Sequence, residues 1–202
     1  MTTLFTIAAS YLIGSIPFSY LFSKLKGADP RHGGSGNVGA TNALVVGGPI
    51  VGILSLIGDI SKGLVAVYIA QAAGLPAIGI SLTGLAAIIG HDFPVFLRFN
   101  GGKGVATTGG VLFAIDPIFT TILILLWVLG LIVIRYFIPT TVLVIGFIPV
   151  MMWMSSWPAE YFILGIGAFI LALYAHRIDL KRYFSGQEKS VGAAWKGFRG
   201  VA

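Results

Sequence analysis

Cysteine is absent from the 202-residue chain, and charged residues make up only 10% of it. Without cysteine the chain forms neither a disulfide framework nor a thiolate zinc site. Its three histidines and scattered carboxylates do not make the clusters that metals require, so we predict no metal and no cofactor. Soluble domains carry about 25% charged residues, whereas 56% of this chain is hydrophobic. This balance excludes a soluble fold and predicts a membrane protein with several spans.

The net charge of +6 has a different meaning in such a chain than in a soluble protein. In a soluble protein it would suggest binding to nucleic acid. In a membrane protein it indicates topology and attraction to anionic headgroups. We therefore expect contact with membrane lipid, no nucleic-acid ligand and no obligate protein partner.

Seven apolar runs are candidates for membrane helices. They cover approximately Thr3–Ser23, Pro49–Ala73, Leu75–Gly90, Gly104–Ile115, Ile118–Ile134, Pro139–Trp153 and Ala159–Ala175. The first run has no basic residue before it and no small-residue cleavage site after it, so we expect a retained helix and not a signal peptide. The fourth run is short for a full crossing, because a bilayer requires about 20 residues.

The charges outside these runs predict the orientation of the chain. The basic residues all fall on one side in this scheme, and Asp116 and Glu160 fall on the other. The positive-inside rule then places the N-terminus outside and the C-terminus in the cytoplasm. The predicted fold is an all-α polytopic membrane protein with seven transmembrane helices and a glycine-rich cytoplasmic or re-entrant loop between helices 1 and 2. Residues 1–186 form a single transmembrane domain, followed by a basic cytoplasmic tail, 187–202.

The loop Gly34-Ser35-Gly36-Asn37-Val38-Gly39-Ala40-Thr41-Asn42 separates the first two apolar runs. Glycines allow positive φ angles and close approach of the backbone to a ligand. Successive N–H groups in such a loop form a concave anion site, and hydroxyl and amide groups add donors. The alternative is a small-residue packing loop, which is common in membrane proteins. The hydroxyl and amide side chains favour the anion site, because polar groups at membrane depth need partners.

A second glycine motif, Asn100-Gly101-Gly102-Lys103-Gly104-Val105-Ala106-Thr107, precedes the fourth run. N–H groups at a helix start favour anions, and Lys103 adds a point charge. The pattern is not a nucleotide P-loop, which has a different spacing and follows a strand. An ordinary positive-inside lysine is the alternative. His91, at the start of the same loop, is either a general base or a structural hydrogen-bonding group.

Two further polar groups interrupt or end apolar runs. Asp59 and Lys62 lie three residues apart, so they share one helix face and can pair within the bundle. They are either a self-contained ion pair or a polar support for the phosphate site. His176, Arg177 and Asp179 end the last run, and composition alone favours a basic cluster at the membrane surface.

These motifs together resemble a known enzyme family. The two glycine motifs, the element Asp59-Ile60-Ser61-Lys62-Gly63 and the opening Tyr11-Leu12-Ile13-Gly14-Ser15-Ile16-Pro17 resemble the acyl-phosphate-dependent glycerol-3-phosphate acyltransferases, the bacterial PlsY family. The resemblance extends to about Gly186. It implies seven helices in the bacterial inner membrane and a cytoplasmic site. It also implies transfer of a fatty acyl group from acyl phosphate to the sn-1 hydroxyl of glycerol 3-phosphate, giving lysophosphatidic acid.

The motifs and the resemblance assign the candidate site residues. The catalytic group comprises Ser35, Asn37, His91 and Lys103; the substrate-binding group comprises Gly34, Gly36, Gly39, Thr41, Asn42, Gly101, Gly102, Gly104, Thr107, His176 and Asp179; Asp59 and Lys62 support them. Acyl phosphate is already activated, so positioning and oxyanion stabilisation suffice. We expect the donor's own phosphate to accept the hydroxyl proton, with His91 as the alternative base.

Three positions depart from the family pattern. Val45 stands where the family usually has arginine, Ile138 where it has serine, and Asp179 where it has asparagine. An arginine at position 45 would be a bidentate phosphate partner, and Asp179 adds negative charge near the expected acceptor phosphate. These departures concern the acceptor site and leave the donor-side glycine motif intact. The alternatives are a paralogue that acylates another alcohol, an inactive family member and a small-anion transporter.

Overall fold

The computed structural model describes residues 1–188 and 190–193, and within them every regular element is a helix. The helices are α1 (Thr2–Gly14), α2 (Phe18–Leu25), α3 (Ala40–Gly47), α4 (Pro49–Ala72), α5 (Ala77–Asp92), η1 (Val95–Leu97), α6 (Val105–Ile115), α7 (Pro117–Ile134), α8 (Phe137–Met154), η2 (Ala159–Tyr161), α9 (Phe162–Ala175) and α10 (Arg177–Phe184). The all-α prediction is confirmed for this part of the chain. Most of the predicted tail, 187–202, lies outside the described residues.

Five segments of the described chain are long and apolar enough to cross a membrane. They are Thr2–Leu25, Pro49–Ala72, Ala77–Leu97, Pro117–Ile134 and Phe137–Met154. A sixth forms if α9 and α10, which meet at an angle of 62°, count as one broken span. Helix α6 spans only 11 residues, or roughly 16 Å, about half the thickness of the hydrocarbon core. The protein is therefore a helical membrane protein with five to six candidate spans by length and composition.

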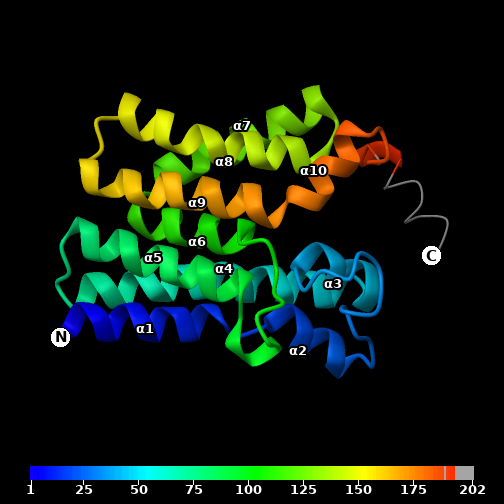
Figure 1. The fold of residues 1–202 in the computed structure, drawn as a ribbon, viewed down its shortest axis with the longest axis horizontal. Coiled ribbons are helices and arrows are strands. Elements are labelled where there is room, and N and C mark those ends of the chain that lie inside the picture. The colour runs from blue at the N-terminus through cyan, green and yellow to red at the C-terminus, as the bar shows by residue number, and fades with distance from the viewer. Residues whose placement is uncertain (189, 194–202) are drawn as a thin grey trace.

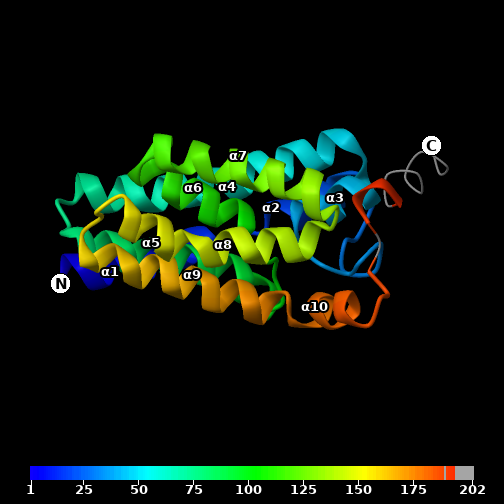
Figure 2. The same cartoon turned by 90° about the horizontal axis from the view of Figure 1, so that it is seen from above.

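The long helices lie side by side in one bundle (Figure 1). In this view α1, α4 and α5 form its lower part, α6 lies above them, and α7, α8 and α9 form the upper part. The N-terminus lies at one end of the bundle, and α3, α10 and the end of the described chain lie at the other (Figures 1 and 2). Both glycine motifs approach this second end.

The first predicted span is divided into α1 and α2. Pro17 has no N–H group and disfavours helical geometry at the residue before it, and it stands between the two helices with φ −91° and ψ 73°. The break at residues 15–17 frees the carbonyl of Ile16 from a helical bond. That carbonyl instead accepts a hydrogen bond from Nζ of Lys62, at 3.1 Å.

Helix α3 is a second difference from the sequence prediction, which placed a glycine-rich cytoplasmic or re-entrant loop between the first two spans. The helix begins after Gly39 and ends at Gly47. The next residue, Gly48, caps it with a φ of 85°, which suits glycine. Its short apolar turn, Ala43-Leu44-Val45-Val46, packs against α4. The second half of the predicted loop is thus a helix that carries Thr41 and Asn42.

Glycines set the closest helix contacts. A Cβ atom on Gly110 of α6 would overlap the backbone oxygen of Ile60 in α4, and one on Gly63 of α4 would overlap the backbone oxygen of Thr107 in α6. Close approach through small residues is typical of membrane helices. It holds α4 and α6 against each other directly beside the polar residues described below.

A pair of neighbouring glycines in α6 tests this packing. Gly110→Ala should destabilise the protein by about 1–3 kcal/mol, because the added methyl overpacks the contact with α4. Gly109→Ala is the matched control, since a Cβ there meets open space and alanine favours a helix by about 1 kcal/mol. Thermal unfolding in detergent should show a lower Tm for the first variant alone. Equal Tm values for both variants would contradict the proposed contact.

Candidate active site

Asp59 joins four helices in the interior, three through its carboxylate and the fourth through its backbone oxygen. Asp59 is 2% exposed, and its Oδ1 lies 2.9 Å from Nζ of Lys62 and 3.4 Å from Nδ1 of His91. Oγ of Ser19 donates to Oδ2 at 3.4 Å, and Oγ1 of Thr107 donates to the Asp59 backbone oxygen at 3.0 Å. A buried carboxylate needs such partners, since an uncompensated charge is costly. The residues come from α2, α4, α5 and α6.

The predicted pairing of Asp59 with Lys62 on one face of α4 is confirmed. The pair is not self-contained, however. Lys62 also reaches the broken segment between α1 and α2 through the Ile16 carbonyl, and His91 approaches from α5. The cluster therefore fixes the relative positions of three parts of the chain.

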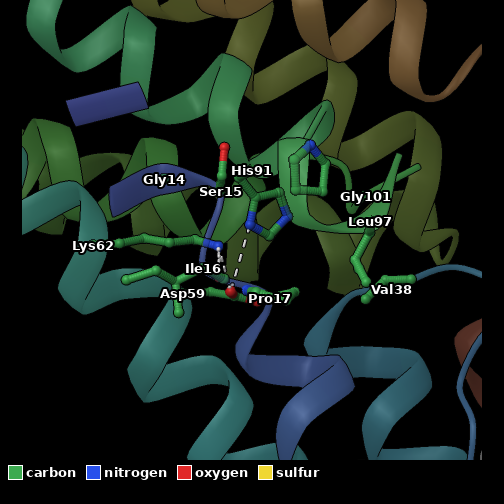
Figure 3. Close-up of a pocket in the computed structure, with 11 residues that line it drawn as sticks. Gly14, Ser15, Ile16, Pro17, Val38, Asp59, Lys62, His91, Leu97 and Gly101 are labelled. Atoms are coloured by element: carbon green, nitrogen blue, oxygen red, sulfur yellow. Dashed lines mark hydrogen bonds and ion pairs between the residues drawn. The ribbon is translucent and has the colours of Figure 1, made fainter. Parts of the chain in front are cut away.

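A small cavity of about 10 Å³ lies against this cluster, with room for about one water molecule. Residues 14–17, at the α1–α2 break, form one wall, and Val38 of the first glycine motif forms another. Pro94, Leu97 and Gly101 of the second loop complete it. Figure 3 shows Lys62 and His91 converging on Asp59, with Val38 and Leu97 side by side next to them. Both glycine motifs therefore meet at the same polar cluster.

The second loop closes on the end of α5 through its glycines. The N–H of Gly101 donates to the backbone oxygen of Asp92, and the N–H of Gly102 donates to the backbone oxygen of His91, both at 3.1 Å. A Cβ on Gly102 would overlap the imidazole of His91, so the close approach requires glycine. Gly104 then adopts φ 68° at the start of α6, a conformation that glycine takes without strain.

The first loop is organised by the side chain of Asn42. Its Nδ2 lies 2.8 Å from the oxygen of Pro30, 3.1 Å from that of Gly33 and 2.9 Å from that of Asn37. Its Oδ1 accepts from the N–H of Ser35 at 2.9 Å. The Asn42 amide is 4% exposed and is occupied within the loop, so its part in substrate binding stays a prediction.

Glycines give this loop its turns, as the sequence predicted. Gly34 and Gly36 have φ angles of 59° and 73°, and Gly39 precedes α3. The side chains of Ser35 and Thr41 are exposed, and Asn37 is half-buried. The loop thus presents hydroxyls at its surface while Asn42 holds its backbone in place.

Lys103 lies in a second polar group, which does not line the cavity. Its Nζ pairs with Oδ2 of Asp179 at 2.5 Å. His176 is buried, with Nδ1 2.9 Å from the Ala172 oxygen. The structure therefore joins Lys103, from the second motif, to the segment that follows α9. Thr107, which the sequence predicts to bind substrate, is fully buried, and its hydroxyl donates to the Asp59 backbone oxygen.

Asp92 was not singled out by the sequence analysis. It is 5% exposed, and neither side-chain oxygen has a hydrogen-bond partner within the described residues. Its place directly after His91 in the loop motif gave no sign of this burial, because the direction of a side chain at a helix end depends on the neighbouring loop.

A second unpredicted cluster anchors the start of the first loop. Oδ2 of Asp29 lies 3.0 Å from Lys24, 2.8 Å from Arg31 and 3.5 Å from His32. The Arg31 guanidinium also lies 4.6 Å from the ring centre of Tyr20. Its hydrogen bonds to Asp29 hold the pKa of that carboxyl below its usual range. The loop is thereby tied to the end of α2.

The chain matches proteins of known type over nearly its whole length. A family model described as glycerol-3-phosphate acyltransferase matches residues 4–186. The glycerol-3-phosphate acyltransferase of Desulforudis audaxviator is 37% identical over 189 residues, covering 93% of this chain and 95% of the relative. That of Dechloromonas aromatica is 40% identical over 192 residues, covering 94% and 96%.

Solved structures agree with these sequences. The crystal structure of PlsY, an integral membrane glycerol 3-phosphate acyltransferase, in its glycerol 3-phosphate form superposes with a TM-score of 0.91 at 35% identity. The superposition covers 98% of this chain and 100% of the solved chain. The lysophosphatidic acid form gives a TM-score of 0.89 at 34% identity, covering 96% and 97%.

These matches and the helical bundle define the class, an integral membrane acyltransferase. Within that class, the chain belongs to the glycerol-3-phosphate acyltransferase family. The resemblance stated from the motifs is therefore confirmed, and the transporter hypothesis loses its support.

A double-mutant cycle tests the buried cluster. Asp59→Asn should destabilise the protein by about 3–5 kcal/mol, because it leaves the Lys62 charge buried with only a carbonyl beside it. Asp59→Asn combined with Lys62→Met should recover part of this loss, since the unpaired charge is gone. Thermal unfolding of the native protein, the two single variants and the double variant in one detergent gives the coupling energy between Asp59 and Lys62. Simple addition of the two single effects would show that the residues do not depend on each other.

Proposed function

We propose that the protein moves a fatty acyl group from acyl phosphate to the sn-1 hydroxyl of glycerol 3-phosphate, giving lysophosphatidic acid. The observation that carries this proposal is the meeting of two glycine loops, through Val38 and Gly101, beside the Asp59 cluster. Both substrates carry phosphate, and glycine loops with free N–H groups suit phosphate oxygens. Family membership supports the acceptor, and the resemblance of the motifs supports the donor.

The reaction balances without a further reactant. The hydroxyl oxygen of the acceptor attacks the carbonyl carbon of acyl phosphate, and the bond from that carbon to the phosphate oxygen breaks. Inorganic phosphate leaves, and the hydroxyl proton passes to it. The protein's task is to align the two substrates and to stabilise the oxyanion, which can supply several kcal/mol each.

The candidate residues divide between the two loops. Ser35 and Asn37 offer a hydroxyl and an amide from the first loop, and Lys103 offers a cation from the second. Asn42 holds the first loop, and Thr107 at the end of the second motif donates to the Asp59 backbone oxygen. Gly101 and Gly102 donate their own N–H groups to α5, so we assign them to loop closure and leave anion binding to the side chains and remaining amides.

We also propose seven crossings in the bacterial inner membrane, with α6 as a short crossing inside the bundle. We place the N-terminus outside and the C-terminus in the cytoplasm. Two observations support this orientation. The N-terminus and the end of the described chain lie at opposite ends of the bundle (Figure 1). Lys24, Arg31 and Arg135 end or follow helices that run toward the second end, whereas Asp116 and Glu160 follow or precede helices at the first.

A different alcohol acceptor is the second candidate function. Val45 is 55% exposed on α3 and offers no charge, and Asp179 is paired with Lys103. Both features weaken the cationic surroundings that an acceptor phosphate requires.

Purified protein with palmitoyl phosphate should form lysophosphatidic acid when glycerol 3-phosphate is added. Glycerol and dihydroxyacetone phosphate, tested in parallel, separate recognition of the phosphate from recognition of the alcohol. Mass spectrometry of the lipid products, together with the release of inorganic phosphate, measures the transfer. Faster acylation of another acceptor would favour the second candidate, and no consumption of palmitoyl phosphate with any acceptor would contradict acyl transfer.

The role of His91 can be tested with a polar side chain kept at this position. Asparagine at this position keeps a polar amide beside Asp59 but cannot accept a proton as a base. If the donor phosphate takes the proton, His91→Asn should retain kcat to within about tenfold, whereas loss of a general base costs about 10²–10⁴-fold. The Tm of the variant controls for folding. A loss of about 10³-fold with an unchanged Tm would make His91 the base.

A further inference from the structure

Asp179 neutralises the one lysine of the second glycine motif. Its Oδ2 pairs with Nζ of Lys103, and both side chains are largely buried, at 18% and 21% exposure. On its other side Oδ1 lies 3.9 Å from Arg182. The three side chains form a row of alternating charge, positive, negative and positive, from the second glycine loop to α10.

Apart from this pair, α10 contacts the bundle through a few exposed side chains, and at its start Arg177 donates to the Tyr174 oxygen at 2.7 Å and lies 4.0 Å from the Tyr174 ring centre. The helix bends away from α9 by 62° at His176, and none of its eight described residues is buried. Its aromatic contact is an edge-to-face one between Tyr183 and Tyr136, with ring centres 5.0 Å apart. Ile178 and Phe184 are exposed. The ion pair to Lys103 is thus a principal link between α10 and the loop.

We propose that Asp179 is a built-in competitor for the acceptor's phosphate at Lys103, so that binding of the phosphate displaces Asp179 and loosens α10. The proposal rests on the proposed function, since it concerns the same loop. It makes Asp179 a residue that determines acceptor affinity, and not a catalytic residue.

The physical basis is competition for one cation. A lysine ammonium is a compact charge with three donors, and a carboxylate already at hydrogen-bond distance occupies its side facing α10. A phosphate that approaches must replace this carboxylate or share the lysine with it at the cost of like-charge repulsion. Displacement leaves Asp179 next to Arg182, a partner already on the same helix. The acceptor and α10 then weaken each other's contact with Lys103 reciprocally.

Removing the charge of Asp179 tests the competition. Asp179→Asn should lower the KM for glycerol 3-phosphate by about fivefold or more, within the usual range of coupling between two binding events. The control is Glu160→Gln, which removes one exposed negative charge in η2, before the start of α9, and should leave KM unchanged. An unchanged or raised KM for Asp179→Asn would overturn the proposal, because Asp179 would then position Lys103 instead of competing for it.

A spectroscopic measurement keeps the inference independent of activity. The chain has no cysteine, so Ser185→Cys, at the end of α10, gives a single site for a spin label. Inorganic phosphate or glycerol 3-phosphate should increase the mobility of this label when Asp179 is present. With Asp179→Asn the label should be mobile from the start and respond little.

The two readouts separate the failure of this inference from that of the function. If glycerol 3-phosphate is not acylated but inorganic phosphate still loosens the label, the competition stands and the proposed acceptor is wrong. If transfer proceeds with native Asp179 while neither anion moves the label at concentrations that saturate turnover, the inference is wrong and the function stands.

Discussion

A carboxylate buried in an apolar bundle must be surrounded by partners, and in this protein the rest of the site depends on how Asp59 meets that requirement. Its charge is paired with Lys62 on the next turn of the same helix, but one pair leaves further oxygen and nitrogen groups to satisfy. Lys62 uses the Ile16 carbonyl, and Ser19 donates to the second carboxylate oxygen. The broken first span is therefore a partner of the charge cluster as well as a packing feature.

Glycine makes this polar arrangement possible within a narrow bundle. Gly63 and Gly110 bring α4 and α6 to backbone contact, which lets Thr107 bond to the Asp59 carbonyl. Gly102 lets the second loop lie against His91. The same residue type thus serves helix packing at one place and loop closure at another. Both uses position the loops over the cluster and leave the exposed hydroxyls of the first loop at the surface.

The features predicted from sequence were those with a local signature. The helical class, the two glycine motifs, the pairing of Asp59 with Lys62 and the positive φ of Gly34 all follow from neighbouring residues. The family followed from the motifs as well. Pro17 breaks the first span locally, but the consequence of the break, an Ile16 carbonyl that accepts a hydrogen bond from Lys62, depends on a contact across 46 positions.

Other features could not be predicted because they arise from long-range contact. That the Asn42 amide bonds to Pro30, Gly33 and Asn37 is visible only once the loop is closed, and its predicted part in substrate binding stays a prediction. Helix α3 gains its stability from α4, which sequence periodicity over eight residues does not indicate. The pairing of Asp179 with Lys103 joins positions 76 apart. The sequence shows both charged residues but does not show that they form an ion pair.

The central claim, that the two glycine loops meet at the Asp59 cluster, can be measured directly by cross-linking. Val38 and Leu97 line the same 10 Å³ cavity, and the native chain has no cysteine to interfere. The double variant Val38→Cys, Leu97→Cys in membranes should form an intramolecular link with oxidant or a short bifunctional reagent. The control double variant, Val38→Cys with Trp153→Cys, should form no such link, because Trp153 lies near the other end of the bundle. Absence of the first link, with both thiols shown to react singly, would contradict the account.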